Sequence, residues 1–344
     1  MPTVRPFHRA DRDQLTDLIN LHVAAVVPGV SVSVNTVLSS LERQPDEFIT
    51  DPWVAERVTL VAEQRRHLVA AAHLLRYRAD DEVGEDYRGA GEISWFVCRP
   101  EASFLPDTGE AAASLMHACL ARLARWDVRV RHADGALPAP AVYGLPHAWP
   151  HIRAVYENAG FRHTGDTELL LIAHVADLPR PEPRPGVTVE RTLGECGTRF
   201  TARRDSGDVL GFIEIDTALA RPERHTRTAG LADIGNLVVV AETAETAETA
   251  GDAGDAGDAG DGGDGGTGDH DARDEHHDHG DAADAGWERW LIGQAADWLR
   301  LCGADRLLAY EDPEDRAAID VLTAAGFREL TRTDRGWRHG ADTG

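Results

Sequence analysis

The chain has 344 residues, of which 42% are apolar and 27% are charged. This composition is typical of a globular protein, and the length predicts two domains. The net charge is −24, which argues against binding to the phosphate backbone of nucleic acid. All basic side chains other than histidine are arginines, because the sequence contains no lysine. That absence excludes Schiff-base chemistry on lysine and a P-loop phosphate lysine.

No run of 18 apolar residues occurs, so we expect neither a membrane span nor a membrane partner. Residues 1–13 are polar and lack the apolar centre of a signal peptide. The four cysteines, Cys98, Cys119, Cys196 and Cys302, are too dispersed for a disulfide framework or a metal site. We therefore predict a cytoplasmic protein without a bound metal.

Two breaks in composition divide the chain. The segment 179–186 alternates proline with charged residues and predicts a stiff linker between domains 1–178 and 187–339. Residues 241–285 hold 15 acidic side chains against Arg273 alone, and almost no large apolar ones. Such a segment buries too little surface to offset its ordering entropy, so we expect a disordered acidic insertion. Its histidines at 270, 276, 277 and 279 bind metals at most loosely, and a solvated spacer is the simpler interpretation.

The first half has the pattern of an α/β domain. Apolar spacing predicts helices over 11–27 and 34–43, a third containing Leu115 to Trp126, and a fourth around Tyr156 that ends at Gly160. Strands are predicted at 3–5, 59–63, 68–76, 91–98 and 141–144, with a turn at 65–66.

The second half repeats the later part of this order. Strands are predicted at 188–191, 198–203, 209–216, 233–240 and 306–310, and helices end at Gly303 and Gly326. Asn158-Ala159-Gly160-Phe161 recurs as Ala324-Ala325-Gly326-Phe327, 166 residues later. An internal duplication explains this recurrence, and the second copy lacks the two early helices.

A strand, a glycine-opened helix, a strand and a helix ending in Tyr-Glu-x-x-Gly-Phe resemble the GNAT acyltransferase superfamily. The match is carried by Trp149 to Phe161, which is similar to the family segment Asn-x-x-Ala-x-x-Leu-Tyr-Glu-x-x-Gly-Phe, with Trp149 and Ile152 as departures. The resemblance covers nearly all of 1–178 and, in reduced form, 187–339. It implies an α/β fold of two GNAT-like domains. Each is a mixed, mostly antiparallel sheet flanked by helices and splayed where acyl-CoA enters.

The resemblance also implies two catalytic side chains. Tyr156 would protonate the departing thiolate; a tyrosine packed on the helix with its hydroxyl satisfied is the alternative. Glu92 would remove the proton of the attacking amine, usually through water; a solvated carboxylate at the strand end is the alternative. His147 and His151, which flank Trp149, are secondary candidates for orienting the acceptor or acting as a base.

Acetyl-CoA is the co-substrate that the resemblance implies. The backbone of Phe96, Val97 and Cys98 would pair with the pantetheine arm, and Arg99 would add positive charge near the phosphates. The family's Arg/Gln-x-x-Gly-x-Gly/Ala turn corresponds to Pro106–Ala111, in which Gly109 and Ala111 match and Pro106 departs. Thr108, Gly109, Glu110 and Ala111 would cradle the pyrophosphate at a helix N-terminus; simple helix capping by Asp107 or Thr108 is the alternative.

The second copy carries weaker signals for catalysis. Leu322 stands where the first copy has Tyr156, Gly286-Trp287-Glu288 replaces the phosphate turn, and Asp233 matches Glu92. We interpret this copy as a degenerate domain that shapes the structure or the substrate site. Tryptophans 287, 290 and 298 have helical spacing and are expected in core or interface packing.

The resemblance therefore implies an N-acetyltransferase that transfers an acetyl group from acetyl-CoA to an amine by direct attack. It also implies that the acceptor lies against Val27–Leu41, where this family builds its acceptor pocket. Small amines, aminoglycosides, amino acids and peptide N-termini all remain open as acceptors. Two alternatives are a non-catalytic acyl-CoA sensor or scaffold of the same fold, and catalysis by the second copy.

Overall fold

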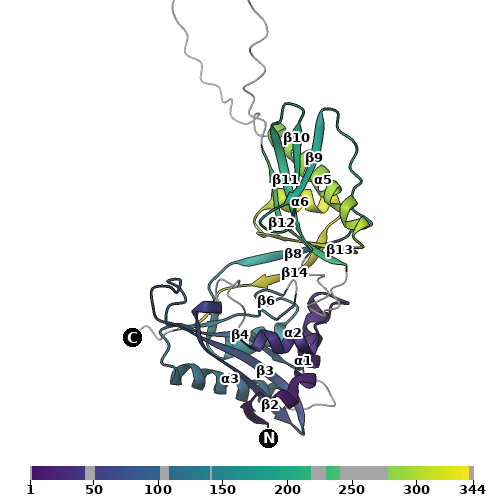
Figure 1. The fold of residues 1–344 in the computed structure, drawn as a ribbon. Helices are drawn as coiled ribbons and strands as arrows, with labels where there is room; N and C mark the ends of the chain where they lie inside the picture. Colours follow the sequence, from purple (N-terminus) through teal and green to yellow (C-terminus); the bar gives the residue numbers. More distant parts are fainter. Residues whose placement is uncertain are drawn as a thin grey trace, which may run out of the picture.

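The computed structural model describes residues 2–42, 51–100, 108–139, 142–217, 230–240 and 278–340. It contains two mixed β-sheets, one of seven and one of eight strands, both flanked by helices (Figure 1). In each sheet all described strand pairs are antiparallel except one, β4 with β5 in the first sheet and β12 with β13 in the second. The predicted α/β architecture, two mixed and mostly antiparallel sheets flanked by helices, is confirmed.

The first sheet has the strand order β1-β2-β3-β4-β5-β15-β7. Short 3-10 turns at Arg9–Asp11 and Asp51–Trp53 precede α1 and β2. The elements of this half are β1 Thr3–Pro6, α1 Arg12–Val26, α2 Val34–Leu41, β2 Val54–Gln64, β3 His67–Tyr77, β4 Gly91–Cys98, α3 Thr108–Arg125, β5 Arg131–Ala133, α4 Pro150–Asn158 and β7 Phe161–His163.

The second sheet has the order β6-β14-β8-β13-β12-β11-β10-β9. No helix separates β9 from β10, so the expected loss of the two early helices from the second copy is confirmed for this described stretch. The elements are β6 Leu145–Pro146, β8 Thr167–His174, β9 Val187–Leu193, β10 Thr198–Arg204, β11 Val209–Asp216, β12 Leu231–Val239, α5 Asp278–Leu301, β13 Arg306–Glu311, α6 Arg316–Ala325, β14 Arg328–Asp334 and β15 Trp337–His339.

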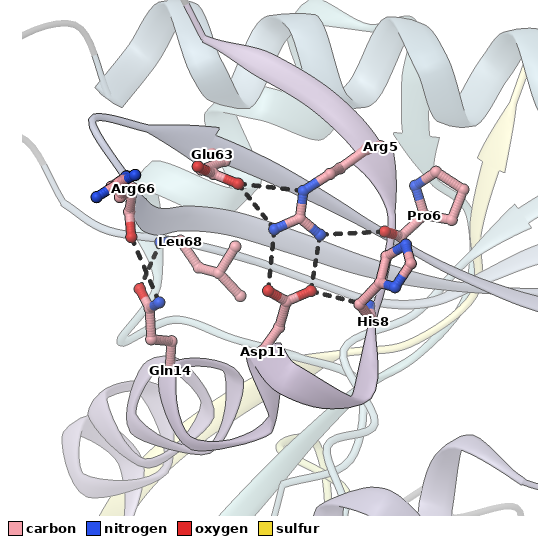
Figure 2. Close-up of polar contacts among 8 residues, drawn as sticks. All are labelled: Arg5, Pro6, His8, Asp11, Gln14, Glu63, Arg66 and Leu68. Atoms are coloured by element: carbon pink, nitrogen blue, oxygen red, sulfur yellow. Dashed lines mark hydrogen bonds and ion pairs between the residues drawn. The ribbon is translucent and has the colours of Figure 1, made fainter.

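The edge strand β1 is fixed to the rest of the first sheet by one arginine. The Arg5 guanidinium donates to both carboxylate oxygens of Asp11, at 2.7 and 2.9 Å, and to Glu63 of β2 at 2.8 Å (Figure 2). The same Asp11 accepts the main-chain N–H of His8 at the start of the helical region. The planar arginine fork thus joins β1, β2 and the beginning of α1 in one network.

The two sheets exchange strands. β8 follows β7 in the chain but lies in the second sheet, between β14 and β13. In return β15, which follows β14, lies in the first sheet between β5 and β7. The expected domain boundary at residue 178 therefore does not coincide with the division between the sheets.

The sequence of β8 explains its central position. It reads Thr-Glu-Leu-Leu-Leu-Ile-Ala-His, and its five middle residues are all buried. Leu170 and Ile172 belong to the first hydrophobic core, whereas Leu169 and Leu171 belong to the second. A strand that is apolar on both faces needs cover on both faces, and the position between the two cores supplies it.

The two crossing segments touch at a pair of glycines. A Cβ on Gly165, between β7 and β8, would lie 2.5 Å from the carbonyl oxygen of Arg335. A Cβ on Gly336, between β14 and β15, would lie 2.8 Å from the Cα of Gly165, and Gly336 has φ +73°. Thr164 N–H donates to Gly336 O, and Arg335 N–H donates to Asp166 O. Both glycines are therefore required by close backbone approach.

The predicted turns and helix ends agree with the structure at several points. Arg65 and Arg66, between β2 and β3, have φ of 52° and 69°. Gly160 and Gly326, which follow α4 and α6, have φ of 89° and 109°. These two matching helix ends support the internal duplication, because the left-handed position after a helix favours glycine.

The predicted strand 141–144 is wrong where it can be compared. Residues 142–144 form no strand, and residue 141 lies outside the described part of the chain. The strand that pairs with β4 is instead β5, Arg131–Ala133. Its three residues, Arg-His-Ala, are too few and too polar to give a periodic signal.

The proline-rich segment 179–186 contains no helix or strand, but it is not a free spacer. Trp290 of α5 donates its indole N–H to Glu182 O, and the Arg184 guanidinium lies 3.8 Å from the ring centroid of Trp287. Trp298 packs against Phe200 of β10. The expected packing role of the three tryptophans is therefore seen, and two of them hold the linker against the second half.

Most of the expected acidic insertion, residues 241–277, lies outside the described residues. Its last part, 278–285, contradicts the expectation of disorder, because α5 begins at Asp278. Alanines and acidic residues fill this stretch. Alanine favours helix, and negative charge is favourable in the first turn of a helix.

Among the described residues, no helix has the length and apolar character needed to cross a membrane. All four cysteines are free; Cys98 and Cys119 are buried, whereas Cys196 and Cys302 are exposed.

The glycine crossing generates a stability prediction. Gly336→Ala places a Cβ against the backbone of Gly165 at a positive φ, so we expect unfolding free energy to fall by about 2 kcal/mol or more. Gly303→Ala, at φ +72° in open space, tests the dihedral cost alone, about 1 kcal/mol. Gly340→Ala has neither feature and serves as the control. Urea denaturation of the three variants measures the difference; equal midpoints for Gly336→Ala and Gly340→Ala would contradict the close-contact argument.

Candidate active site

A cavity of about 500 Å³ opens where β4 ends, between the first turns of α3 and the outer face of α4. Its walls are mainly apolar, and three basic side chains reach it: Arg99, His117 and His151. Concave sites of this volume with a few polar groups are typical of small-molecule binding. Of the predicted cofactor residues, four line this cavity: Cys98, Arg99, Thr108 and Gly109.

The cavity borders an open edge of β4. β4 and β5 pair only over Gly91–Ile93, and the N–H of Asp134 makes a final bond to Ile93 O. Beyond that point the strands part. The N–H of Arg99 donates to Val69 O of β3. Main-chain groups alternate sides along a strand, so Val97 also faces β3. Phe96 and Cys98 consequently direct their main-chain groups to the side that β5 has left.

His151, which lines the cavity, pairs with the buried His22 of α1. His22 Nδ1 lies 2.8 Å from Leu18 O, and a carbonyl can only accept, so this nitrogen carries the proton. Burial lowers the pKa of His22 to about 4, which keeps the ring neutral with Nε2 as acceptor. His151 Nε2 lies 3.2 Å from both His22 Nε2 and Cys98 O. His151 Nε2 is therefore the donor, and one main-chain acceptor of the β4 edge is already occupied.

The N-terminus of α3 opens on the same cavity. Helix α3 begins at Thr108, whose side chain is 1% exposed and whose hydroxyl has no hydrogen-bond partner in the described structure. Gly109 lines the cavity, whereas Glu110 is exposed, Ala111 is buried, and neither lines it. The preceding residues 101–107, with Pro106 and Asp107, lie outside the described residues.

Glu92 is buried, so the alternative of a solvated strand-end carboxylate is wrong. Only 8% of the residue is exposed, and the Tyr77 hydroxyl donates a short hydrogen bond to its carboxylate. Burial, followed by the nearby charge of Asp134, raises the pKa of Glu92 to about 7. Burial also raises the pKa of Asp134. A buried carboxyl group, Glu92, and a half-buried one, Asp134, therefore lie where β4 and β5 begin to part.

Tyr156 is fully buried and its hydroxyl donates to the main-chain carbonyl of Asp134 at 2.7 Å. Its ring packs against Phe96, Phe161 and Trp337. Burial raises the pKa of Tyr156 far above its ordinary value, so the phenol keeps its proton. The side chain does not line the cavity, and this geometry matches the packed tyrosine that the sequence left as an alternative.

Both departures from the family segment are buried side chains. Trp149 is fully buried and donates its indole N–H to His22 O, and Ile152 is 1% exposed. The Trp149 bond joins the start of α4 to α1. The predicted acceptor segment Val27–Leu41 lines neither this cavity nor the polar cavity described below.

No protein-family model matches the sequence, and no curated protein matches it. Solved structures do match. A tandem GNAT protein from the clavulanic acid biosynthesis pathway is 13% identical with a TM-score of 0.55, covering 99% of this chain and 100% of that one. The chain has the tandem GNAT fold.

Two further structures agree with this fold. A GCN5-related N-acetyltransferase from Sphaerobacter thermophilus is 13% identical with a TM-score of 0.52, covering 99% of this chain and 97% of that one. A glucosamine N-acetyltransferase region in a fungal multi-domain β-N-acetylglucosaminidase is 12% identical with a TM-score of 0.54, covering 98% of this chain and 38% of that one. At these identities the likeness shows the GNAT fold alone.

The second GNAT repeat differs at the corresponding positions. Leu322 is buried where the first repeat has Tyr156. Gly286-Trp287-Glu288 lies inside α5, which begins at Asp278, so these residues do not form a turn at a helix N-terminus. This corrects their expected place in the phosphate turn. Burial, followed by Asp216, raises the pKa of Asp233 to about 7, and one carboxylate oxygen of Asp233 is buried without a partner in the described structure.

Two residues of the first GNAT repeat were missed by the sequence interpretation. The Asp134 charge raises the pKa of Glu92, and the Asp134 main-chain carbonyl accepts the Tyr156 hydroxyl. His22 Nε2 accepts a hydrogen bond from His151. An acid directly after β5 was the available signal for Asp134, but β5 itself was not predicted. His22 lies within the predicted helix 11–27, and its partner His151 is distant in sequence.

The raised pKa of Glu92 generates a pH prediction. The folded chain binds this proton more tightly than the unfolded chain, whose carboxyl has its ordinary pKa of 4.5. Folding stability from this group is present at low pH and is lost as pH rises from 4.5 through about 7. Between pH ~5 and pH ~8 we expect the unfolding free energy of the parent to fall by about 2 kcal/mol more than that of Glu92→Gln, which lacks the titrating carboxyl. Urea titrations at several pH values measure this, with the exposed Glu157→Gln as control. Parallel pH curves for parent and Glu92→Gln would refute the raised pKa.

Proposed function

We propose that this protein is an acetyl-CoA-dependent N-acetyltransferase whose active site lies in the first GNAT repeat. The observation that carries the proposal is the cavity that joins the N-terminus of α3, Arg99 and the open main-chain edge of β4. Each part suits a different part of an acyl-CoA. The acetyl group would pass to an amine by direct attack.

The residues present fit the co-substrate. The first N–H groups of α3 and the Arg99 guanidinium would hold the pyrophosphate, since a helix N-terminus and arginine both favour phosphate. The Thr108 hydroxyl, buried without a partner in the described structure, would gain one. The main-chain groups of Phe96 and the N–H of Cys98 would pair with the pantetheine amides, since Cys98 O already accepts from His151. The co-substrate supplies the activated thioester, and the chain supplies orientation and proton transfer.

The proton acceptor in this proposal is Glu92. A pKa of about 7 leaves the carboxyl partly ionised at neutral pH, which suits a general base. The amine nitrogen forms the new C–N bond, its proton passes to Glu92, and the C–S bond breaks. Tyr156 would protonate the departing thiolate, which requires its hydroxyl to leave Asp134 O. His151, which lines the cavity, is the alternative proton-transfer group.

Two observations favour a second candidate, an acyl-CoA-binding module without catalysis. The Tyr156 hydroxyl is engaged by a main-chain carbonyl. Trp149 and Ile152 are buried and larger than the asparagine and alanine of the family segment. A protein that binds coenzyme A but acetylates no amine would keep the phosphate-binding groups at the N-terminus of α3 and lack the proton donor.

The deciding experiment combines calorimetry with coenzyme A and a turnover assay with acetyl-CoA and a panel of amines. Binding with turnover supports the enzyme. Binding without turnover on any amine supports the binding module. Absence of coenzyme A binding refutes both.

Replacing Arg99 tests the phosphate cradle. We expect Arg99→Gln to weaken coenzyme A binding about tenfold, because one charge-assisted contact to phosphate is lost. The loss grows at low salt, where charge attraction is less screened. Arg125→Gln removes the same charge from the exposed far end of α3 and is the matched control. Equal affinities for the two variants in calorimetry would place the phosphates elsewhere.

Replacing Tyr156 tests the proton donor. In the proposed reaction Tyr156→Phe lowers kcat by about 100-fold or more and leaves KM for acetyl-CoA nearly unchanged. A purely structural tyrosine gives the opposite pattern, a lower Tm and an unchanged kcat. Steady-state kinetics with thermal unfolding separate the two, and the partly exposed Tyr143→Phe is the control.

A further inference from the structure

A second cavity of about 500 Å³ lies where the two GNAT repeats meet. Asp134 and Tyr87 of the first repeat form one side, and the end of β13, Tyr310–Asp312, forms the other. The crossing segments 165–168 and 335–336 complete the wall. Both repeats and both exchanged segments are therefore needed to form it.

The lining of this cavity is strongly acidic. Five carboxylates reach it, against the single guanidinium of Arg335, and none of the five forms an ion pair with any described residue; they are Asp134, Asp166, Glu168, Glu311 and Asp312. Burial raises the pKa of Asp134 and brings that of Glu311 to about 7. Asp134, Glu168 and Glu311 are half-buried, whereas Asp166 and Asp312 are exposed. Partial burial of a carboxylate without a cation is costly, and a cationic ligand would offset that cost for the first three.

An unsatisfied hydroxyl points to a ligand independently of the charge. The hydroxyl oxygen of Tyr310, a lining residue, is buried and has no hydrogen-bond partner in the described structure. Asp233 is close enough to raise the pKa of Tyr310. One of its carboxylate oxygens is also buried without a hydrogen-bond partner in the described structure. Buried polar atoms are nearly always hydrogen-bonded.

The arrangement suits an extended cation better than a metal ion. Among the described residues, no group of three or more histidine, cysteine or acidic side chains is close enough to hold a metal. A divalent ion needs its oxygen ligands within a single coordination sphere. Carboxylates distributed around a cavity match separate positive charges along one molecule.

Asp134 connects this cavity to the proposed reaction centre. Its side chain lines the cavity, its N–H makes the last bond between β5 and β4, and its carbonyl accepts the Tyr156 hydroxyl. The Asp134 charge contributes to the raised pKa of Glu92, the proposed base. An amine anchored by the outer carboxylates would therefore present one nitrogen toward the point where β4 and β5 part.

We infer that the cavity between the repeats is the acceptor site, and that the acceptor is a polyamine with two or more separated ammonium groups. This inference rests on the proposed function. One ammonium loses a proton to water before attack. As the new C–N bond forms and the C–S bond breaks, the second proton passes to Glu92. The amide product carries one positive charge fewer, which weakens its hold on the carboxylates and favours release.

The inference replaces Val27–Leu41 as the acceptor site and uses the second GNAT repeat. That repeat contributes Tyr310, Glu311 and Asp312 to the cavity, which gives the degenerate copy a substrate-shaping role.

Calorimetry on the full chain, without acetyl-CoA, tests the binding. The probes are spermidine, butylamine and magnesium chloride at low salt. We expect spermidine to bind at least about 100-fold more tightly than butylamine, because several charge contacts are lost in the monoamine. Spermidine that binds no better than butylamine would overturn the inference. Magnesium that displaces spermidine at equal concentration would overturn it also.

A double variant locates the site. We expect Glu168→Gln with Asp312→Asn to weaken spermidine binding at least about tenfold, with Tm unchanged or higher because unpaired like charges are removed. The control is Glu314→Gln with Asp297→Asn, two exposed acids outside the cavity with the same change in net charge. Equal weakening by both pairs would show attraction to the overall negative charge and would overturn the site.

The outcome for binding is separable from that for catalysis. Spermidine binding that depends on the cavity, without acetyl transfer to spermidine, supports the cationic site and contradicts the proposed enzyme. Acetyl transfer to simple amines without spermidine binding supports the enzyme and contradicts the polyamine site.

Discussion

The exchange of the last strand between the two sheets is the constraint on which the rest of the structure depends. β15 completes the first sheet between β5 and β7, and β8 completes the second between β14 and β13 (Figure 1). The alternating leucines of β8 pack into different cores, so one strand belongs to both. Neither sheet has its full set of strands without the other half of the chain, and the two repeats therefore form one cooperative unit rather than two independent ones.

This exchange also positions Tyr156 and completes the wall of the acidic cavity. Trp337 of β15 packs against Tyr156 and so fixes the α4 tyrosine from the far end of the chain. Asp334, just before the crossing, is buried and accepts from His147, Thr167 and the Arg153 guanidinium of α4. The crossing segments then wall the acidic cavity. The position of the first repeat's catalytic candidates is consequently set by residues of the second repeat.

The sequence predicted local elements well because local signals specify them. Hydrophobic spacing located α1, β3 and α4, and the glycines at 160 and 326 marked helix ends that the structure confirms. The bounds of β4, Gly91–Cys98, agree with the prediction. The resemblance to the GNAT superfamily supplied the fold class, which the solved structures support.

The features that the sequence could not reveal depend on contacts between residues that are distant in the chain. The strand exchange leaves no periodic signal, because β15 has three residues and β8 was hidden within the expected end of the first domain. The burial of Glu92 depends on Tyr77 and Asp134, and the engagement of Tyr156 depends on a carbonyl contributed by a loop. The acidic cavity needs both repeats side by side, so no motif in either one indicates it.

The late position of β15 has a consequence for synthesis. A ribosome releases the N-terminal repeat long before Trp337 is translated, and domains ordinarily fold in that order as they emerge. Here the nascent first sheet lacks the strand between β5 and β7, and two strand edges stay unpaired there until β15 has been translated. Such edges are templates for wrong pairing, so this molecule has reason to rely on chaperone protection during translation, and a circularly permuted gene that places β15 beside β7 would shorten the exposed interval.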